Sequence, residues 1–281
     1  MNTALPAMPH SINCRGKLVD LSRPLIMGIL NMTPDSFSDG GKFNSEKSAL
    51  LHAGKMMGEG ASIIDIGPQS TRPKADFLTA AEEIKRLGKI ISLIKSEFPE
   101  LLISLDTFYA ETVKFGFDEG IDIVNDISAG QFDSQMIETV LKTGLPYILM
   151  HVNPDYASMH EKIKYDDITC DVNRFLLEKA DELLKTGMKD IILDPGFGFG
   201  KGITDQYKLL DESQYIGLGK FPVLIGISRK SFIYKQLGKG PNEVTEETQQ
   251  LHRKVLEKGA SILRVHDVAA TKVAVDQFLR N

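Results

Sequence analysis

The sequence has few cysteines, no long apolar run and no excess of positive charge. Its only two cysteines, Cys14 and Cys170, form no CxxC pair and give no basis for a disulfide framework. This scarcity of cysteine fits a reducing compartment. No apolar run approaches the roughly 20 residues that a membrane-spanning helix needs. The amino-terminal residues lack the basic-then-apolar order of a signal peptide, so we expect a cytoplasmic protein with no membrane association.

The charge balance is slightly acidic, with a net charge of -5 over 281 residues. This argues against a general nucleic-acid-binding protein, which would present a basic surface. An anionic small-molecule substrate remains compatible with it, because a few local cations can hold one. The hydrophobic content of 42% and charged content of 25% are typical of a globular protein.

Short apolar, β-branched runs recur along the chain, and patterns of helical period separate them. The runs are nearly continuous in hydrophobicity, as in strands buried on both faces of a parallel sheet. The predicted strands are 25–30, 62–66, 102–105, 121–124, 146–150, 191–193, 223–227 and 262–265. The predicted helices are 46–58, 80–97, 110–118, 133–142, 167–185 and 243–258. Glycines in "GEGAS", "DEGID" and "EKGAS" suit left-handed helix ends just before a strand.

Eight strands alternating with helices fit either a closed (β/α)8 TIM barrel or an open doubly wound sheet. Eight such units within about 250 residues favour the barrel. The segment 11–22 ahead of them predicts a short β-hairpin that plugs the barrel bottom. Because no linker or low-complexity stretch interrupts the chain, we predict a single domain over residues 1–281.

Nearly every predicted strand ends in a polar or charged residue. In a barrel the carboxyl ends of the strands converge on one mouth, where barrel enzymes have their active sites. One such residue alone would more often cap a helix or fix a turn, but eight such ends together predict an active site. These residues are Asn31, Asp65, Asp106, Asn125, Asp126, His151, Asp194, 228–230, Arg264 and His266.

Cations gather after the last two predicted strands. Arg229 and Lys230 follow the seventh strand, and Arg264 and His266 lie at the end of the eighth. The loops at these two places frequently bind phosphate in barrels, and arginine makes bidentate contacts to phosphate. We therefore predict a phosphorylated, anionic substrate. The alternative is a set of ion pairs that close the mouth.

Two carboxylates, Asp106 and Asp194, end strands that are predicted to be buried. A buried carboxylate can accept two donors from the edge of an aminopyrimidine, and the amide of Asn125 can complete such a contact. A flat heteroaromatic ligand is one interpretation. The alternatives are a helix cap for Asp106 and a turn before proline for Asp194.

The run "LDPGFGFGK" is rich in glycine but is not a Walker A loop, since Gly202 follows Lys201 where serine or threonine belongs. Its glycines would let the backbone approach a flat ligand closely. Two long polar loops, "NMTPDSFSDGGKF" and "GPQSTRPKAD", are predicted to move over the barrel mouth, unless they are ordinary surface turns.

Eight sequence blocks resemble, in the same order, those of the dihydropteroate synthases. They are "GILNMTPDSFSDGG", "GASIIDIGPQSTRP", "SLDTF", "IVNDIS", "ILMH", "LDPGFGFGK", "GISRKSFI" and "LRVHDV". The resemblance covers roughly residues 12–280 and implies a (β/α)8 barrel that is usually a homodimer. It implies a Mg2+-assisted condensation of 6-hydroxymethyl-7,8-dihydropterin diphosphate with 4-aminobenzoate. The products would be 7,8-dihydropteroate and pyrophosphate.

The resemblance also implies roles for individual residues. Asn31 would hold Mg2+ and the diphosphate, and Arg264 and His266 would hold the diphosphate. The pterin ring would be bound by Asp106, Asn125, Asp194 and Lys230. The residues that frame 4-aminobenzoate would be Ser70, Thr71, Arg72, Pro73, Phe199 and Ser231. Asp35 and Phe37 would close over the reacting centre, and no covalent nucleophile is required.

The chain departs from the family pattern in three places. The second block usually reads "GGESTRPG" but is "GPQSTRPK" here, with Pro68, Gln69 and Lys74. After His151, "VNPDYASMH" replaces the usual Met–x–Gly–x–Pro stretch, and "EETQQLH" stands where the family usually has "NGT". These places concern the second loop, the 4-aminobenzoate pocket and the dimer face. We predict the ordinary activity with altered sensitivity to sulfonamides.

Three other functions stay open at this point. A methyltetrahydrofolate-binding methyltransferase domain shares the barrel and pterin site, but it has no need of the cations in "GISRKSFI" and "LRVHDV". A paralogue that binds pterin without turnover is opposed by the intact Asn31, Lys230, Arg264 and His266. A barrel enzyme for a phosphorylated sugar would not need both Asp106 and Asp194.

Overall fold

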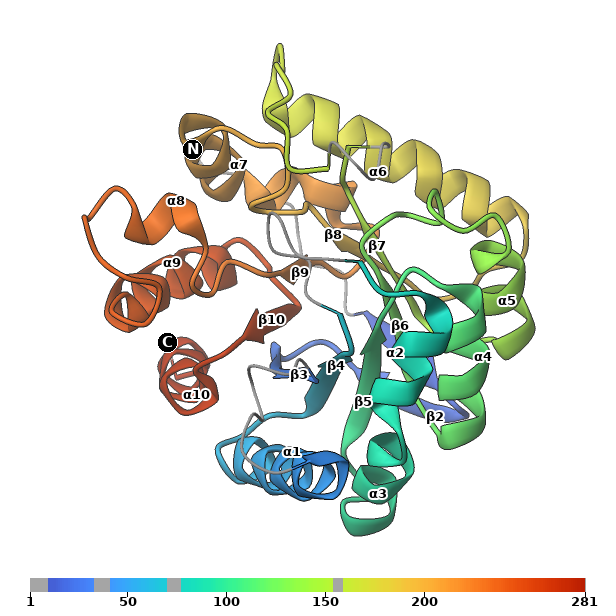
Figure 1. Ribbon diagram of the computed structural model, residues 1–281. Coiled ribbons are helices and arrows are strands. Elements are labelled where there is room, and N and C mark those ends of the chain that lie inside the picture. Colours follow the sequence, from blue (N-terminus) through green and yellow to red (C-terminus); the bar gives the residue numbers. More distant parts are fainter. Residues whose placement is uncertain (1–9, 33–40, 70–76, 154–158, 281) are drawn as a thin grey trace.

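The computed structural model describes residues 10–32, 41–69, 77–153 and 159–280. Eight parallel strands form a central wall with helices around it (Figure 1). The strand order is β8-β7-β6-β5-β4-β3-β10-β9, and a parallel bridge between Leu193 and Val223 joins the two ends. The sheet is therefore a nearly closed barrel, as predicted, and the open doubly wound alternative is wrong.

Strands and helices alternate along the chain. The barrel strands are β3 (Leu25–Asn31), β4 (Ile63–Gly67), β5 (Leu102–Asp106), β6 (Ile123–Asp126), β7 (Tyr147–Met150), β8 (Ile191–Asp194), β9 (Leu224–Ile225) and β10 (Ile262–Val265). The helices are α1 (Gly41–Gly58), α2 (Ala80–Leu87), α3 (Ile90–Glu97), α4 (Ala110–Glu119), α5 (Met136–Thr143), α6 (Ile168–Lys185), α7 (Ile203–Asp211), α8 (Ser231–Tyr234), α9 (Thr245–Glu257) and α10 (Val268–Phe278), with a 3-10 helix at Ser213–Gly219. None of the described helices is long and apolar enough to cross a membrane.

Several predicted boundaries are wrong for local reasons. The single helix predicted over 80–97 is two helices, because Gly88 adopts φ 53° and breaks the run between α2 and α3. The helix predicted from 133 begins at Met136, after a turn in which the backbone N–H of Gln135 donates to Asp133 Oδ1 and that of Met136 to the Asp133 carbonyl oxygen. The predicted glycine ends are confirmed: φ is 108° at Gly60, 108° at Gly120 and 89° at Gly259.

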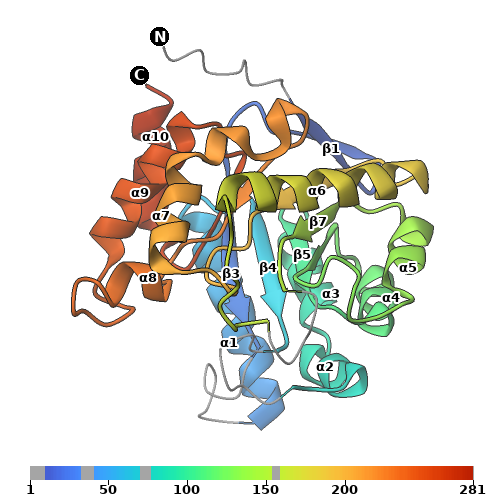
Figure 2. The same ribbon diagram turned by 90° about the horizontal axis from the view of Figure 1, so that it is seen from above.

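The amino-terminal hairpin lies at one end of the barrel. It consists of β1 (Ser11–Cys14) and β2 (Lys17–Asp20), paired antiparallel. In Figure 2 the arrowheads of β3 and β4 point away from β1, so the hairpin covers the amino-terminal ends of the strands. Its buried side chains pack against one residue from each barrel strand. This cluster contains Ile12, Cys14, Leu21, Met27, Ile63, Leu102, Ile123, Ile148, Ile192, Leu224 and Ile262. The predicted plug at the barrel bottom is confirmed.

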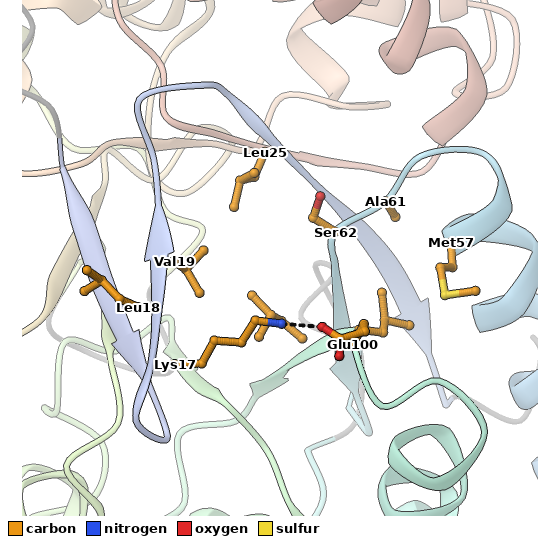
Figure 3. A pocket seen from close by; sticks show the side chains of 10 residues that line it. Lys17, Leu18, Val19, Leu25, Met57, Ala61, Ser62 and Glu100 are labelled. Atoms are coloured by element: carbon orange, nitrogen blue, oxygen red, sulfur yellow. Dashed lines mark hydrogen bonds and ion pairs between the residues drawn. The ribbon is translucent and has the colours of Figure 1, made fainter.

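A pocket of about 350 Å3 opens beside the hairpin at this bottom end. Apolar side chains dominate its lining, and the ion pair between Lys17 and Glu100, at 2.6 Å, lies among them (Figure 3). Leu25 and Leu102, which begin β3 and β5, also line it. The pocket therefore lies at the opposite end of the barrel from the polar strand ends.

Candidate active site at the barrel mouth

Four residues at the carboxyl ends of the strands form a hydrogen-bonded cluster. The Arg264 guanidinium donates from Nε to Asp65 Oδ2 at 2.6 Å and from Nη2 to Asp106 Oδ2 at 2.8 Å. Asn125 Nδ2 donates to the same Asp65 oxygen at 3.1 Å. Arg264 and Asp65 are 199 positions apart in the chain, so barrel closure brings them together.

Asn31 belongs to the same neighbourhood. It ends β3 and is the register partner of Gly67 at the end of β4. A Cβ built on Gly67 would lie 3.5 Å from Asn31 Oδ1 and 3.7 Å from Asp106 Oδ2. Because Gly67 has no side chain, the space next to the Asn31 amide and the Asp106 carboxylate is left open. A larger residue at this position would fill it.

The loop after β8 folds tightly around its own backbone groups. Asp194 Oδ1 accepts a hydrogen bond from the backbone N–H of Gly196 at 2.7 Å. The alternative prediction for Asp194, that it stabilises a turn, is therefore confirmed. The buried ammonium of Lys201 donates to the carbonyl oxygens of Gly196 at 2.8 Å, Phe199 at 3.2 Å and His151 at 3.4 Å. Lys201 thus joins this loop to the end of β7. The helix-cap alternative for Asp106 is wrong, because Tyr109 occupies the position before α4.

Lys230 and Phe199 face each other across the mouth. The Lys230 ammonium lies 4.7 Å from the centroid of the Phe199 ring, and the His160 ring stacks on Phe199 at 5.3 Å. A Cβ on Gly198 would meet Lys230 Cδ at 3.0 Å. The glycine-rich loop therefore lies against Lys230, and Ser231 follows directly as the first residue of α8.

The cations after β9 and β10 point in different directions. The backbone N–H of His266 donates to Ser228 Oγ at 3.2 Å, and His266 Nδ1 lies 3.1 Å from the same oxygen. The Arg229 guanidinium instead contacts Asp267 Oδ1 at 2.6 Å and Asn242 Oδ1 at 2.8 Å. The ion-pair alternative is therefore correct for Arg229, which pairs with Asp267, and also for Arg264, which pairs with Asp65 and Asp106. Lys230 lies near the carboxylates of Asp194 and Asp106.

Burial and neighbouring charges shift the pKa values of the mouth residues. Burial raises the pKa of Asp106 to about 7 against the opposing charge of Arg264, and it also raises the pKa of Asp194. Burial and the charge of Arg264 lower the pKa of Lys230 to about 8. Burial would lower the pKa of Arg264, but the charges of Asp65 and Asp106 outweigh it and raise that pKa. Burial lowers the pKa of His266 to about 3, so its ring is neutral at pH 7.

The structure places most of the predicted site residues together. Asn31, Asp106, Asn125, Asp194, Phe199, Lys230, Arg264 and His266 all lie around the mouth. Asp35, Phe37, Ser70, Thr71, Arg72 and Pro73 lie outside the described residues, as do most of the two long loops. Three contacts had no prediction: Asp65 as a partner of Arg264, Ser228 as a partner of His266, and Lys201 as the buried centre of its loop. Asp65 and Ser228 lie at predicted strand ends, and this position was the sequence feature that could have indicated their place in the site.

No group of three His, Cys, Asp or Glu side chains that could hold a metal occurs among the described residues. Mg2+, however, commonly binds through one or two protein oxygens together with water and substrate phosphates. The amide oxygen of Asn31 is such a donor, and Gly67 leaves space beside it. The site therefore fits a Mg2+ ion that binds with a phosphorylated ligand.

Known proteins resemble this chain over nearly its whole length. The family described as "Pterin binding enzyme" matches residues 27–266. Dihydropteroate synthase of Escherichia coli K12 is 40% identical over 263 residues, which cover 93% of each chain. The structure of Xanthomonas albilineans dihydropteroate synthase with 4-aminobenzoic acid superposes with a TM-score of 0.89 at 34% identity, covering 97% of this chain and 98% of that one. A Yersinia pestis dihydropteroate synthase in a sulfonamide drug complex gives a TM-score of 0.89 at 37% identity, covering 96% and 98%.

Proposed function

The chain belongs to the dihydropteroate synthase family of pterin-binding enzymes, and we propose that it joins 6-hydroxymethyl-7,8-dihydropterin diphosphate to 4-aminobenzoate, releasing 7,8-dihydropteroate and pyrophosphate. The observation that carries this proposal is the convergence of Asp106, Asn125, Asp194, Lys230 and Arg264 on one barrel mouth. Carboxylates for a flat aminopyrimidine and cations for a diphosphate are the two kinds of group that this substrate requires.

The pterin ring would be recognised by the buried carboxylates. Asp106 and Asp194 supply acceptors for the ring N–H groups, and Asn125 supplies an amide beside them. Arg264 already contacts Asp106, which holds that carboxylate in one orientation before the ligand arrives. The Lys230 ammonium, at the edge of the same carboxylates, would contact the ring from the side of Phe199.

The diphosphate would lie at the Asn31, Arg264 and His266 side of the mouth. A Mg2+ ion bound there with the diphosphate would neutralise charge that develops on the leaving group. Arg264 offers a fixed positive charge at this place, and its side chain is 20% exposed. His266, neutral and held by Ser228, would contribute a hydrogen bond rather than a charge.

4-Aminobenzoate would bind beside Phe199 and Ser231. The Phe199 ring is almost buried, and its contact with the Lys230 ammonium places it next to the pterin site. Ser231, at the start of α8, would offer a hydroxyl to the benzoate end. We propose that Ser70, Thr71, Arg72 and Pro73 complete this pocket and that Asp35 and Phe37 close over it.

The reaction would break the bond between the pterin methylene carbon and the diphosphate oxygen, and it would form a bond from that carbon to the aniline nitrogen. The bond electrons would leave with pyrophosphate, and the proton lost by the aniline nitrogen would pass to pyrophosphate or water. The electron-rich pterin can delocalise positive charge on the methylene carbon, so the protein need supply no covalent nucleophile. Cys14 is buried in the bottom cluster, and Cys170 is an exposed free thiol in the first turn of α6. Exclusion of water, a competing nucleophile, would protect the reacting carbon.

Pyrophosphate release with pterin diphosphate, 4-aminobenzoate and Mg2+, each omitted in turn, tests this proposal. We expect release only when all three are present. Asp194→Asn should lower kcat/KM about 100-fold, because it removes a buried charge from the pterin site. The matched control Asp211→Asn, at an exposed position on α7, should leave it unchanged. Tight pterin binding without release would support a binding paralogue instead.

The Yersinia pestis dihydropteroate synthase forms a complex with a sulfonamide drug, and we propose that sulfonamides occupy the 4-aminobenzoate pocket of this chain. Gln69, one of the residues that depart from the family pattern, is buried, and its Oε1 accepts a hydrogen bond from the backbone N–H of Leu78 at 2.6 Å. It therefore ties the two ends of the second loop together. The inhibition constants of sulfonamides should differ between this chain and an ordinary family member. In Gln69→Glu, these constants should move towards those of the ordinary family member. Equal constants in the unmodified chain and the ordinary member would refute the predicted change in sulfonamide sensitivity.

The homodimer, the cytoplasmic location and the single domain over residues 1–281 stay predictions. The homodimer rests on the family resemblance, and the location rests on the two free cysteines and the composition. Light scattering of the purified chain would measure its oligomeric state.

A further inference from the structure

Arg229 is a cation at the barrel mouth whose side chain is turned away from the mouth carboxylates. Its Nη2 contacts Asp267 Oδ1 at 2.6 Å, its Nε contacts Asp267 Oδ2 at 3.3 Å, and its Nη1 contacts Asn242 Oδ1 at 2.8 Å. The guanidinium thus makes a bidentate ion pair with one carboxylate and a further hydrogen bond to an amide. All three nitrogen atoms have protein partners.

The backbone at Arg229 is strained. Its φ is 56°, in the left-handed region that is unfavourable for a residue with a side chain. Arg229 is the third residue of a turn in which the N–H of Lys230 donates to the carbonyl oxygen of Ile227 at 3.1 Å, and glycine is the usual residue there. Some interaction must offset this strain, and the pairing with Asp267 is the strongest that Arg229 makes.

The turn also positions the residues on either side of Arg229. Ser228, the second residue of the turn, contacts His266, and Lys230, the fourth, places its ammonium over the Phe199 ring. Asp267 directly follows His266. The Arg229–Asp267 pair therefore cross-links the loop that carries Lys230 to the loop that carries His266, next to both residues.

We propose that Arg229 and Asp267 form a positioning pair for the pterin diphosphate site. The ion pair holds the strained turn, and the turn aims Lys230 and His266 into the mouth. Arg229 is a positioning residue and does not itself bind the diphosphate. This inference rests on the proposed function for the roles of Lys230 and His266.

A double-mutant cycle tests the pair. The variants are Asp267→Asn, Arg229→Gln and the two combined, each of which keeps a polar side chain of similar size. We expect each single change to lower kcat/KM for pterin diphosphate about 10- to 100-fold, as small displacements of binding groups do. KM for 4-aminobenzoate should change less than about twofold. The combined variant should be no worse than the poorer single variant, since either change breaks the same pair.

Asp276→Asn is the matched control. It removes the same charge from an ion pair on α10, in which Asp276 contacts Lys272, and it should leave both KM values and the melting temperature unchanged. The melting temperatures of the test variants show whether a loss of activity comes from a loss of folded protein.

Three results would overturn the positioning pair. One is unchanged kcat/KM in both single variants. Another is a much larger loss of kcat/KM in Arg229→Gln than in Asp267→Asn, with a double variant whose loss is the product of the two single losses. That pattern would mean that Arg229 binds the substrate itself. The third is a parallel loss for both substrates with a lower melting temperature, which means a general structural role. Absence of pyrophosphate release by the unmodified chain would overturn the proposed function instead, and calorimetric titration of the same variants with pterin diphosphate would then test the pair.

Discussion

Replacement of Gly196 by alanine is expected to destabilise the protein strongly, because this glycine packs against the backbone of the neighbouring strand. Its φ of 68° alone costs alanine about 1–2 kcal/mol. The added Cβ would also lie 2.0 Å from the carbonyl oxygen of His151, whereas carbon–oxygen contacts need about 3.3–3.6 Å. The end of β7 or the loop must therefore move by more than about 1 Å, and such overpacking costs typically about 1–3 kcal/mol.

The two contributions together predict a loss of about 2–5 kcal/mol in the free energy of unfolding of Gly196→Ala. For a chain of 281 residues that corresponds to a melting temperature lower by about 3–9 °C, measured by differential scanning calorimetry. Gly187→Ala is the control. Gly187 has φ 98° but would place its Cβ with nothing within 4 Å, so it loses only the backbone contribution. Melting temperatures of the two variants within about 1 °C of each other would refute the packing argument.

Three further predictions concern the same region and the buried histidines. In Gly198→Ala the nearest atoms to the new Cβ belong to the flexible Lys230 side chain, the closest at 3.0 Å. KM for pterin diphosphate should therefore rise, while the melting temperature should fall no further than in Gly187→Ala. An unchanged KM would contradict this prediction. Lys201→Met leaves three backbone carbonyls without their ammonium donor and should lower the free energy of unfolding, measured with urea, by about 2–4 kcal/mol. A loss below about 1 kcal/mol would show that the loop does not need the Lys201 ammonium. Burial lowers the pKa of His151 to about 2 and that of His252 to about 4, so the unfolded chain binds protons below about pH 6.5 that the folded chain does not. As the pH falls from about 6.5 to 5, stability should therefore fall with a slope that approaches about 1.4 kcal/mol per pH unit for each histidine. The fall should be less steep in His252→Gln, and equal slopes would exclude His252 as a cause.

Hydrophobic pattern was sufficient to predict the barrel. Strands buried on both faces give continuous apolar runs, and the strand-end position of Asn31, Asp106, Asn125, Asp194 and Arg264 follows once the strands are known. The break at Gly88 was missed because the apolar positions keep a helical period on both sides of it. A glycine within such a pattern does not reveal whether its φ becomes positive.

The pairing of charges could not be predicted from the sequence. Arg229 and Arg264 look alike as strand-end cations, but one turns outward to Asp267 and the other inward to Asp65 and Asp106. The difference comes from the left-handed turn at Arg229 and from contacts between residues far apart in the chain. Lys201 is a similar case, since a lysine in a glycine-rich loop would ordinarily be solvated, and only the folded loop supplies three carbonyls to it.

The plug at the barrel bottom has a consequence for the order in which the chain can fold. The hairpin of residues 11–20 packs on side chains from all eight barrel strands, and Ile262 of the last strand is among them. Its docking surface is therefore incomplete until almost the entire chain has left the ribosome. The hairpin is synthesised before every barrel strand but can dock only after the last of them, so these contacts of long sequence separation form late in folding.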